Sequence, residues 1–375
     1  MIRKSIFVIV VLTASMWLLR SIDWGLDLTW PQNVVRNWQQ FGLVTLHGKL
    51  VENPGGFEAL EHPDVYPGMS PVSLYPVYFS IVALQWTGLG TLSFHALLAL
   101  AVMWGAWRLS GQNRFAAILA AAAVLCPGYM RSQKVLDPNS IAVLMFIPYA
   151  AVALSVLKKP QVKPLAMTGL FLLTLCLMSL NWTVAWACGP FIVLLLATPG
   201  INRRALLGLV GALILGGMAV VGISVMAKSG GGGGGHFSTF LRGYTWGNTG
   251  YGVGLTTGKA FFRLAFVNGI GLFPLWLVLA YAVATSSRHR GRLAWLAWAP
   301  LALTIVDIVV MRNYFGHHPP MAGPLLLLGI VFTISLLRCS QDTVENIPSL
   351  AVPIAALLCF LFGLSALAFF QANQK

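Results

Sequence analysis

Apolar runs of about 20 residues recur along the whole chain of 375 residues, and they constrain its fold more than any other feature. Of all residues, 57% are apolar and only 9% are charged. An ordinary soluble domain carries roughly 25% charged residues. These figures exclude a disordered chain, a disulfide scaffold and an ordinary soluble enzyme. They predict an all-α, polytopic membrane protein.

The runs predict about 11 transmembrane helices. Their expected ranges are 5–20, 91–107, 115–129, 140–157, 165–180, 183–199, 205–227, 269–286, 293–311, 320–337 and 350–370. The segment 74–88 could add a further span, but it would move most basic connections outside the cell. Because basic loops stay in the cytoplasm, we expect 74–88 to form an interfacial or re-entrant helix.

The net charge of +14 arises from 24 Lys and Arg against 10 Asp and Glu. We interpret it mainly as a topology signal rather than as a sign of nucleic-acid binding, because many of the basic residues lie in short connections between expected spans. These residues are Arg108, Arg114, Lys158, Lys159, Lys163, Arg203, Arg204, Arg288, Arg290 and Arg292. The pattern predicts a protein integral to the plasma (inner) membrane, with a cytoplasmic N-terminus and with the C-terminus and working face outside.

The expected organisation is a single transmembrane domain over residues 1–375. It includes a first outer loop, 21–90, with juxtamembrane helices, and a glycine-rich flexible outer loop, 228–268, that contains six consecutive glycines from Gly230 to Gly235. The Gly, Thr and aromatic residues of 245–258 can order over a substrate as a lid, or the whole segment can be a simple tether.

Two acids, Asp23 and Asp27, follow the first expected span directly. Pro31 then opens a predicted helix over residues 32–41, which Gly42 ends. A carboxylate held at the mouth of a span is suited to general-base catalysis or metal binding. The alternative is that both acids only solvate the start of the loop.

Further candidate residues lie in the other outer segments. Basic side chains are disfavoured in outer loops, so their presence there calls for an explanation. They can bind an anionic ligand such as a lipid phosphate, or they can contact ordinary lipid headgroups. Asp307 lies within an expected span, where it needs a cavity or an ion-pair partner such as Arg312. The other residues singled out are Arg131, Lys134, Asp137, Arg263, His62, Tyr75, Tyr314, His317 and His318. The histidines can bind phosphate or a divalent metal, or can line a solvated loop.

The order of these elements resembles the GT-C superfamily of integral membrane glycosyltransferases, which use polyprenyl-phosphate-linked sugars and include protein mannosyltransferases and aminoarabinose transferases. Asp27, the helix from Asn33 to Gly42, and Gly48 look like the first-loop acid, juxtamembrane helix and following glycine of that family. The stretch from His62 to Tyr78 looks like its proline-aromatic segment, Cys126 to Ala142 like its second outer loop, and Arg312 to Pro319 like its late outer loop.

The resemblance implies inverting sugar transfer from a polyprenyl-phosphate donor to a lipid, glycan or protein acceptor. It assigns general-base or assisting roles to Asp27, Asp23 and Asp137. Donor-phosphate binding falls to Arg131, Lys134, Arg312 and Arg263. Contacts to the acceptor or donor fall to His62, Tyr75, Tyr314, His317 and His318. A divalent metal is possible, and no other cofactor is implied. Departures from the family are the missing Asp-Glu and Arg-Tyr pairs in the first loop and the missing Trp-Trp-Asp-type motif.

Two other functions fit the sequence. A transporter or flippase for lipid-linked sugars would need broken helices near the membrane midplane, and Pro148 and Pro190 lie inside expected spans. A non-catalytic membrane subunit of an envelope-polysaccharide complex would need no acid pair. The acids gather in outer loops while most span centres are uncharged, which favours an enzyme.

Overall fold

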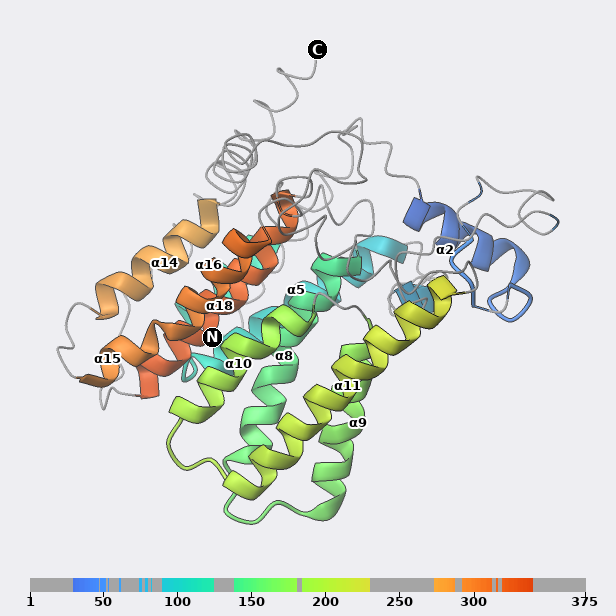
Figure 1. The fold of residues 1–375 in the computed structure, drawn as a ribbon. Coiled ribbons are helices and arrows are strands. Elements are labelled where there is room, and N and C mark those ends of the chain that lie inside the picture. The colour runs from blue at the N-terminus through green and yellow to red at the C-terminus, as the bar shows by residue number, and fades with distance from the viewer. Residues whose placement is uncertain are drawn as a thin grey trace.

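The computed structural model describes the helical bundle and part of the first predicted loop. The described residues are 30–46, 48–51, 53, 61, 74–75, 78–79, 82, 90–124, 138–180, 184–229, 273–286, 292–311, 315 and 319–339. Their elements are helices, which confirms the all-α class for this part of the chain (Figure 1). The expected spans 5–20 and 350–370 lie outside the described residues.

The helices reproduce most of the expected ranges. They are α2 (Trp30–Phe41), α5 (Gly90–Leu109), α6 (Arg114–Val124), α8 (Pro138–Leu157), α9 (Pro164–Leu180), α10 (Val184–Ala197), α11 (Arg203–Ser229), α14 (Phe273–Ser286), α15 (Arg292–Ala297), α16 (Ala299–Val310) and α18 (Pro319–Cys339). Among them, only the stretch Ser140–Leu157 of α8 is long and apolar enough to cross a bilayer by itself, and it is mostly buried. A buried core helix can have the same properties, so this finding leaves the predicted number of spans open.

The predicted span 293–311 is wrong as a single helix. It consists of α15 and α16, which meet at Trp298. Pro300 lies in the first turn of α16, where a residue without a backbone N–H is tolerated. Because proline has no N–H to donate, it cannot continue the hydrogen bonds of α15. The Trp298 N–H instead bonds the Trp295 carbonyl at 3.2 Å. The proline therefore ends one helix and begins the next.

Helix α8 lies at the centre of the bundle and packs against α5, α9, α10 and α18. Aromatic rings of α8, α10 and α18 pack together there: the rings of Phe146 and Phe191 are 5.3 Å apart, and those of Phe191 and Phe332 are 5.8 Å apart. The buried Tyr149 hydroxyl lies 2.8 Å from the Thr174 hydroxyl of α9. Close packing and one satisfied polar pair thus hold the middle of the bundle.

Short turns join consecutive antiparallel helices at one end of the bundle, at the bottom of Figure 1 for the α8–α9 and α10–α11 turns. Asn113 and Asn202 cap α6 and α11, each accepting two backbone N–H groups through its side-chain oxygen. The Asn202 N–H also bonds the Leu157 carbonyl at 2.9 Å, which ties two turns together. We call this end of the bundle, with turns 110–113, 158–163 and 198–202 and the end of α18, the basic end.

The basic residues of the described helices and turns concentrate at this end, except for Lys228 in α11, Arg36 in α2 and Lys49 in the loop after α2. They are Arg108, Arg114, Lys158, Lys159, Lys163, Arg203, Arg204, Arg292 and Arg338. Each lies in a helix end or turn that reaches the basic end. Basic residues that are scattered along the chain therefore gather on one side of the described bundle.

Candidate functional site

Helix α2 forms as the sequence predicts, starting two residues earlier than expected. One face buries Val34, Val35 and Trp38, whereas Gln39 and Gln40 are exposed. Gly42 ends the helix with φ +88°, a conformation that glycine adopts without a side-chain clash, and its N–H bonds the Trp38 carbonyl at 3.0 Å. The helix is amphipathic and lies against the bundle through Val35.

Asn37 and Trp38 attach the following loop to α2. The Asn37 amide donates to the carbonyls of Val51 and Asn53, at 2.9 and 3.0 Å. The Trp38 indole N–H donates to the Lys49 carbonyl at 2.8 Å. Both side chains are fully buried. Asn37 was not a predicted site residue, although an asparagine on the apolar face of an amphipathic helix is a readable signal of a buried polar contact.

Tyr75 is the predicted site residue that the structure describes, and it packs on this loop. The centre of its ring lies 5.5 Å from that of the Trp38 ring. The ring of Tyr78 packs edge-on against Trp38, with the ring centres 5.6 Å apart. Leu46, Leu50 and Leu74 complete a small separate core. We call the assembly of α2, residues 42–46 and 48–51, and the residues Leu74, Tyr75, Tyr78 and Phe79 the α2 unit.

Burial raises the pKa of the Tyr75 hydroxyl above its ordinary value of 10. Tyr75 is therefore a neutral phenol at physiological pH and can act as a hydrogen-bond donor and ring contact, not as a base. This chemistry fits the predicted contact role. The α2 unit lies at the far end of the bundle from the α8–α9 and α10–α11 turns (Figure 1).

Gly48 lies directly beneath the Tyr75 hydroxyl with φ +66°. A Cβ atom there would lie 2.5 Å from the hydroxyl oxygen. We expect Gly48→Ala to destabilise the α2 unit by about 1–2 kcal/mol from backbone strain, with the steric clash adding to it. Adding Tyr75→Phe to this variant should remove the steric clash, because the hydroxyl is gone, but not the backbone strain at position 48. Thermal unfolding of the two single variants and the double variant measures this coupling, and strictly additive effects would contradict the contact.

The remaining predicted site residues cannot be placed relative to Tyr75, because they lie outside the described residues. They are Asp23, Asp27, His62, Arg131, Lys134, Asp137, Arg263, Arg312, Tyr314, His317 and His318. Their roles stay predictions. The described residues contain no group of three His, Cys, Asp or Glu side chains that could hold a metal ion. The histidines predicted as possible metal ligands lie outside the described residues, and a divalent metal stays a prediction.

Asp307 is half-buried on α16. No described residue forms an ion pair or hydrogen bond with its carboxylate, and its predicted partner Arg312 lies outside the described residues. Its neighbours Val306 and Val310 are exposed apolar side chains. The acid thus borders an outward apolar surface of α16, and the predicted ion pair is untested.

Tyr281 organises a polar cluster that the sequence did not reveal. Its hydroxyl accepts hydrogen bonds from the Asn113 amide and, at 2.9 Å, from the Arg338 guanidinium. Its ring packs 4.9 Å from that of Phe115. The cluster links α14, the α5–α6 turn and α18 at the basic end. It holds helices together, and Arg338 is used there for structure.

Comparison with known proteins returned no matching family model, no curated protein and no solved structure.

Proposed function

We propose that this chain is a polytopic membrane glycosyltransferase that moves a sugar from a polyprenyl-phosphate donor to a lipid, glycan or protein acceptor on the outer face of the plasma membrane. The α2 unit is the observation that carries this proposal. It is an amphipathic helix whose following loop is held by Asn37 and Trp38 and whose Trp38 carries the ring of Tyr75, and it contacts the bundle through Val35. Its place, away from the basic end, fits the face on which the resemblance puts the chemistry.

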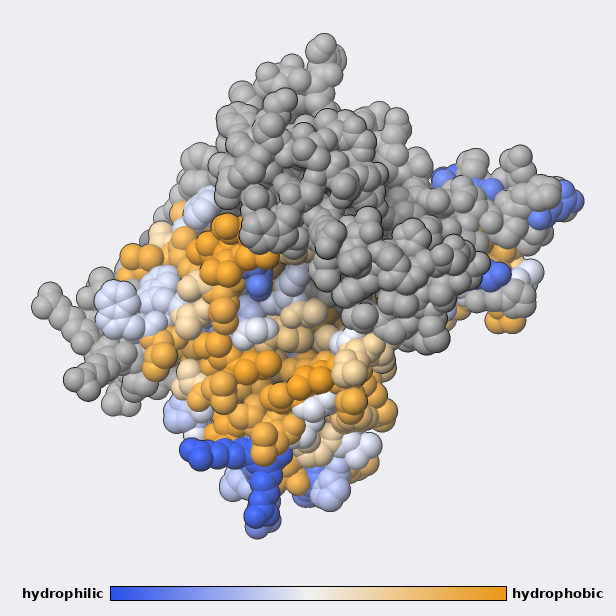
Figure 2. Space-filling model, in the orientation of Figure 1, coloured by the Kyte–Doolittle hydropathy of each residue, from blue (hydrophilic) through white to orange (hydrophobic). Residues whose placement is uncertain are grey.

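Outward apolar surfaces support the membrane placement. Large apolar side chains are exposed along the middle of α5, α9, α11, α14 and α16, and the view in Figure 2 shows an orange surface with hydrophilic residues at its lower end. The exposed residues include Leu97, Leu100, Trp104, Leu172, Leu173, Ile214, Leu215, Met218, Trp276, Val283, Ile305, Val306, Val309 and Val310. A helix that is apolar on all sides is stable in lipid or in a protein core, and contiguous exposed apolar surface marks a partner or a membrane.

The orientation gives a testable prediction. A reporter enzyme that works only outside the membrane should be inactive when fused after Arg204, because the basic end would be cytoplasmic. The same reporter inserted into the 42–46 turn of the α2 unit should be active. Activity after Arg204 would show that the segment 74–88 spans and that the working face is on the other side.

In the proposed reaction, an acceptor oxygen bonds to the sugar C1 while the bond from C1 to the phosphate oxygen breaks, with inversion. Asp27 takes the acceptor proton, and the leaving lipid phosphate is stabilised by basic side chains, of which Arg131 and Arg312 are our first choices. Tyr75 would contact the substrate from the α2 unit.

The decisive experiment is sugar transfer from a lipid-linked donor by full-length protein in proteoliposomes. Asp27→Asn should lower the rate at least about 100-fold, since general-base catalysis typically contributes 10²–10⁴-fold. Asp23→Asn should have the smaller effect, because the resemblance ranks Asp27 first. Unchanged unfolding midpoints would show that both variants fold. Full activity of both would exclude the base assignment.

A flippase for lipid-linked sugars is the second candidate, favoured by prolines inside three neighbouring helices. Pro148, Pro190 and Pro324 lie in α8, α10 and α18, which pack against one another. Interior prolines free backbone carbonyls and allow helices to bend, as transport requires. Movement of a labelled lipid-sugar across protein-containing liposomes, without transfer to an acceptor, would favour this function over the enzyme.

A further inference from the structure

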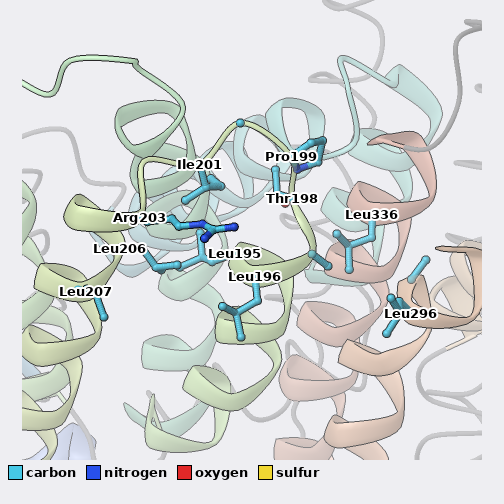
Figure 3. A pocket seen from close by; sticks show the side chains of 13 residues that line it. Leu195, Leu196, Thr198, Pro199, Ile201, Arg203, Leu206, Leu207, Leu296 and Leu336 are labelled. Atoms are coloured by element: carbon cyan, nitrogen blue, oxygen red, sulfur yellow. The ribbon is translucent and has the colours of Figure 1, made fainter.

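A cavity of about 630 Å³ opens at the basic end (Figure 3). Four helices and one turn form it: the ends of α10 and α18, the turn 198–201, the start of α11, and α15. Its volume is within the range of about 300–1,000 Å³ typical of small-molecule sites. Nothing in the proposed glycosyl transfer uses this cavity.

Arg203 is the charged residue that lines the cavity. Its side chain extends from the start of α11 toward Leu195 (Figure 3). The guanidinium forms no hydrogen bond or ion pair with any described residue. The backbone N–H groups of Arg204 and Ala205 in the first turn of α11 are already bonded to the Asn202 side chain, so the helix end itself offers little to a ligand. An anion in the cavity would therefore be held mainly by the Arg203 side chain.

The walls of the cavity are apolar, and its rim is exposed. Leu195 and Ala297 are buried in the wall, whereas Leu196, Leu207 and Leu296 are exposed at 70%, 72% and 54%. The Thr198 hydroxyl donates to the Leu194 carbonyl at 2.6 Å and is not free for another acceptor. A single cation at the edge of a leucine-lined opening matches a ligand with one anionic group and an apolar body.

We propose that this cavity binds one anionic phospholipid of the cytoplasmic leaflet, with the lipid phosphate on Arg203 and an acyl chain along Leu196, Leu207 and Leu296. The proposal relies on the membrane placement argued above, but not on glycosyl transfer. Exposed basic residues beside the opening, Lys158 and Arg204 among them, add a general attraction for anionic headgroups. Arg203 is exposed as well, but it differs from them because its side chain lines the cavity.

The exposed leucines argue for a lipid rather than a free anion. Inorganic phosphate would leave the apolar rim in water, whereas an acyl chain would cover it. The rim also lies at the level where headgroup and chain regions would meet, one turn from the basic residues that would mark the membrane surface. A membrane lipid satisfies the charge and the apolar surface together.

Native mass spectrometry of full-length protein in detergent, titrated with phosphatidylglycerol or phosphatidylcholine, tests the proposal. We expect preferential retention of one phosphatidylglycerol. Arg203→Ala should weaken its binding by about tenfold or more, since a charge-assisted contact is lost. The matched control Arg204→Ala removes the same charge from the adjacent residue, which does not line the cavity. At elevated salt, which screens the general attraction of basic residues outside the cavity, Arg204→Ala should change binding by less than about threefold.

A second variant tests the apolar part of the site. Leu207→Ser keeps Arg203 and changes an exposed residue, so the fold should tolerate it, yet it should weaken phosphatidylglycerol binding. Equal weakening by Arg203→Ala and Arg204→Ala would overturn the proposal in favour of a diffuse surface charge effect. Equal binding of phosphatidylcholine, or Arg203-dependent binding of inorganic phosphate with the same affinity, would overturn it too. Because no sugar transfer is measured, loss of the Asp27 hypothesis would leave these outcomes unaffected.

Discussion

Gly105→Ala is expected to destabilise the bundle, although the same exchange usually stabilises a helix. An added Cβ at position 105 of α5 would lie 2.8 Å from the backbone nitrogen and 2.9 Å from the Cα of Pro148 in α8. These are backbone atoms of a central helix and cannot move like the end of a side chain. The two helices must separate, and overpacking of this kind costs about 1–3 kcal/mol.

Gly211→Ala in α11 is the matched control. No atom lies within 4 Å of the Cβ position there, so only the intrinsic preference for alanine, about 0.8–1.0 kcal/mol, should act. Thermal unfolding of the two full-length variants in the same detergent should therefore give shifts of opposite sign. If Gly105→Ala unfolds at or above the temperature of Gly211→Ala, the close approach of α5 and α8 is not present in solution.

Trp38→Ala is expected to unfold the α2 unit and leave the bundle intact. Trp38 is fully buried, contacts the rings of Tyr75 and Tyr78, and donates to the Lys49 carbonyl. Truncating a buried tryptophan costs about 3–5 kcal/mol, more than a core as small as that of the α2 unit is expected to withstand. Hydrogen exchange should accelerate for the amides of Leu46 to Val51, whereas those in the middle of α8 should keep their protection.

Two variants sharpen this second test. Trp38→Phe keeps most of the ring contacts but leaves the Lys49 carbonyl without its donor, so we expect a cost of about 1 kcal/mol. Trp104→Ala truncates a tryptophan that is 42% exposed on α5, and the exchange of residues 46–51 should not change. Under the proposed function, Trp38→Ala should also lower sugar transfer, because Tyr75 loses its support. Full protection of residues 46–51 in Trp38→Ala would show that the loop does not depend on this side chain.

Several elements could be predicted from local sequence because their signals are local. Helix α2 follows from an amphipathic stretch between Pro31 and Gly42, and the observed helix spans Trp30–Phe41. The basic turns at 158–163 and 198–202 follow from charge placed between apolar runs. The division of 293–311 into α15 and α16 was missed. Pro300 indicates it, but the apolar run is long enough for one span, and the prediction followed its length.

The candidate site could be predicted only in part. Tyr75 was chosen by resemblance, and the structure places it on the buried Trp38. Asn37 and Tyr281 were missed, since their hydrogen-bond partners are 14 and 168 residues away along the chain. Arg203 was interpreted only as a topology signal. The cavity beside Arg203 forms where the ends of four helices meet in space. The residues next to Arg203 in the sequence do not indicate that these helices meet.

By itself, the sequence determined the helical class, the helix ends at glycine, proline and asparagine, and the basic turns between apolar runs. Only the tertiary structure decided which helix faces meet, as in the approach of Gly105 to Pro148 and in the cavity beside Arg203. The physical reason is that these helices are apolar all round. Hydrophobic periodicity identifies a buried face when the opposite face is polar, and here that contrast is absent from the bundle helices but present in α2.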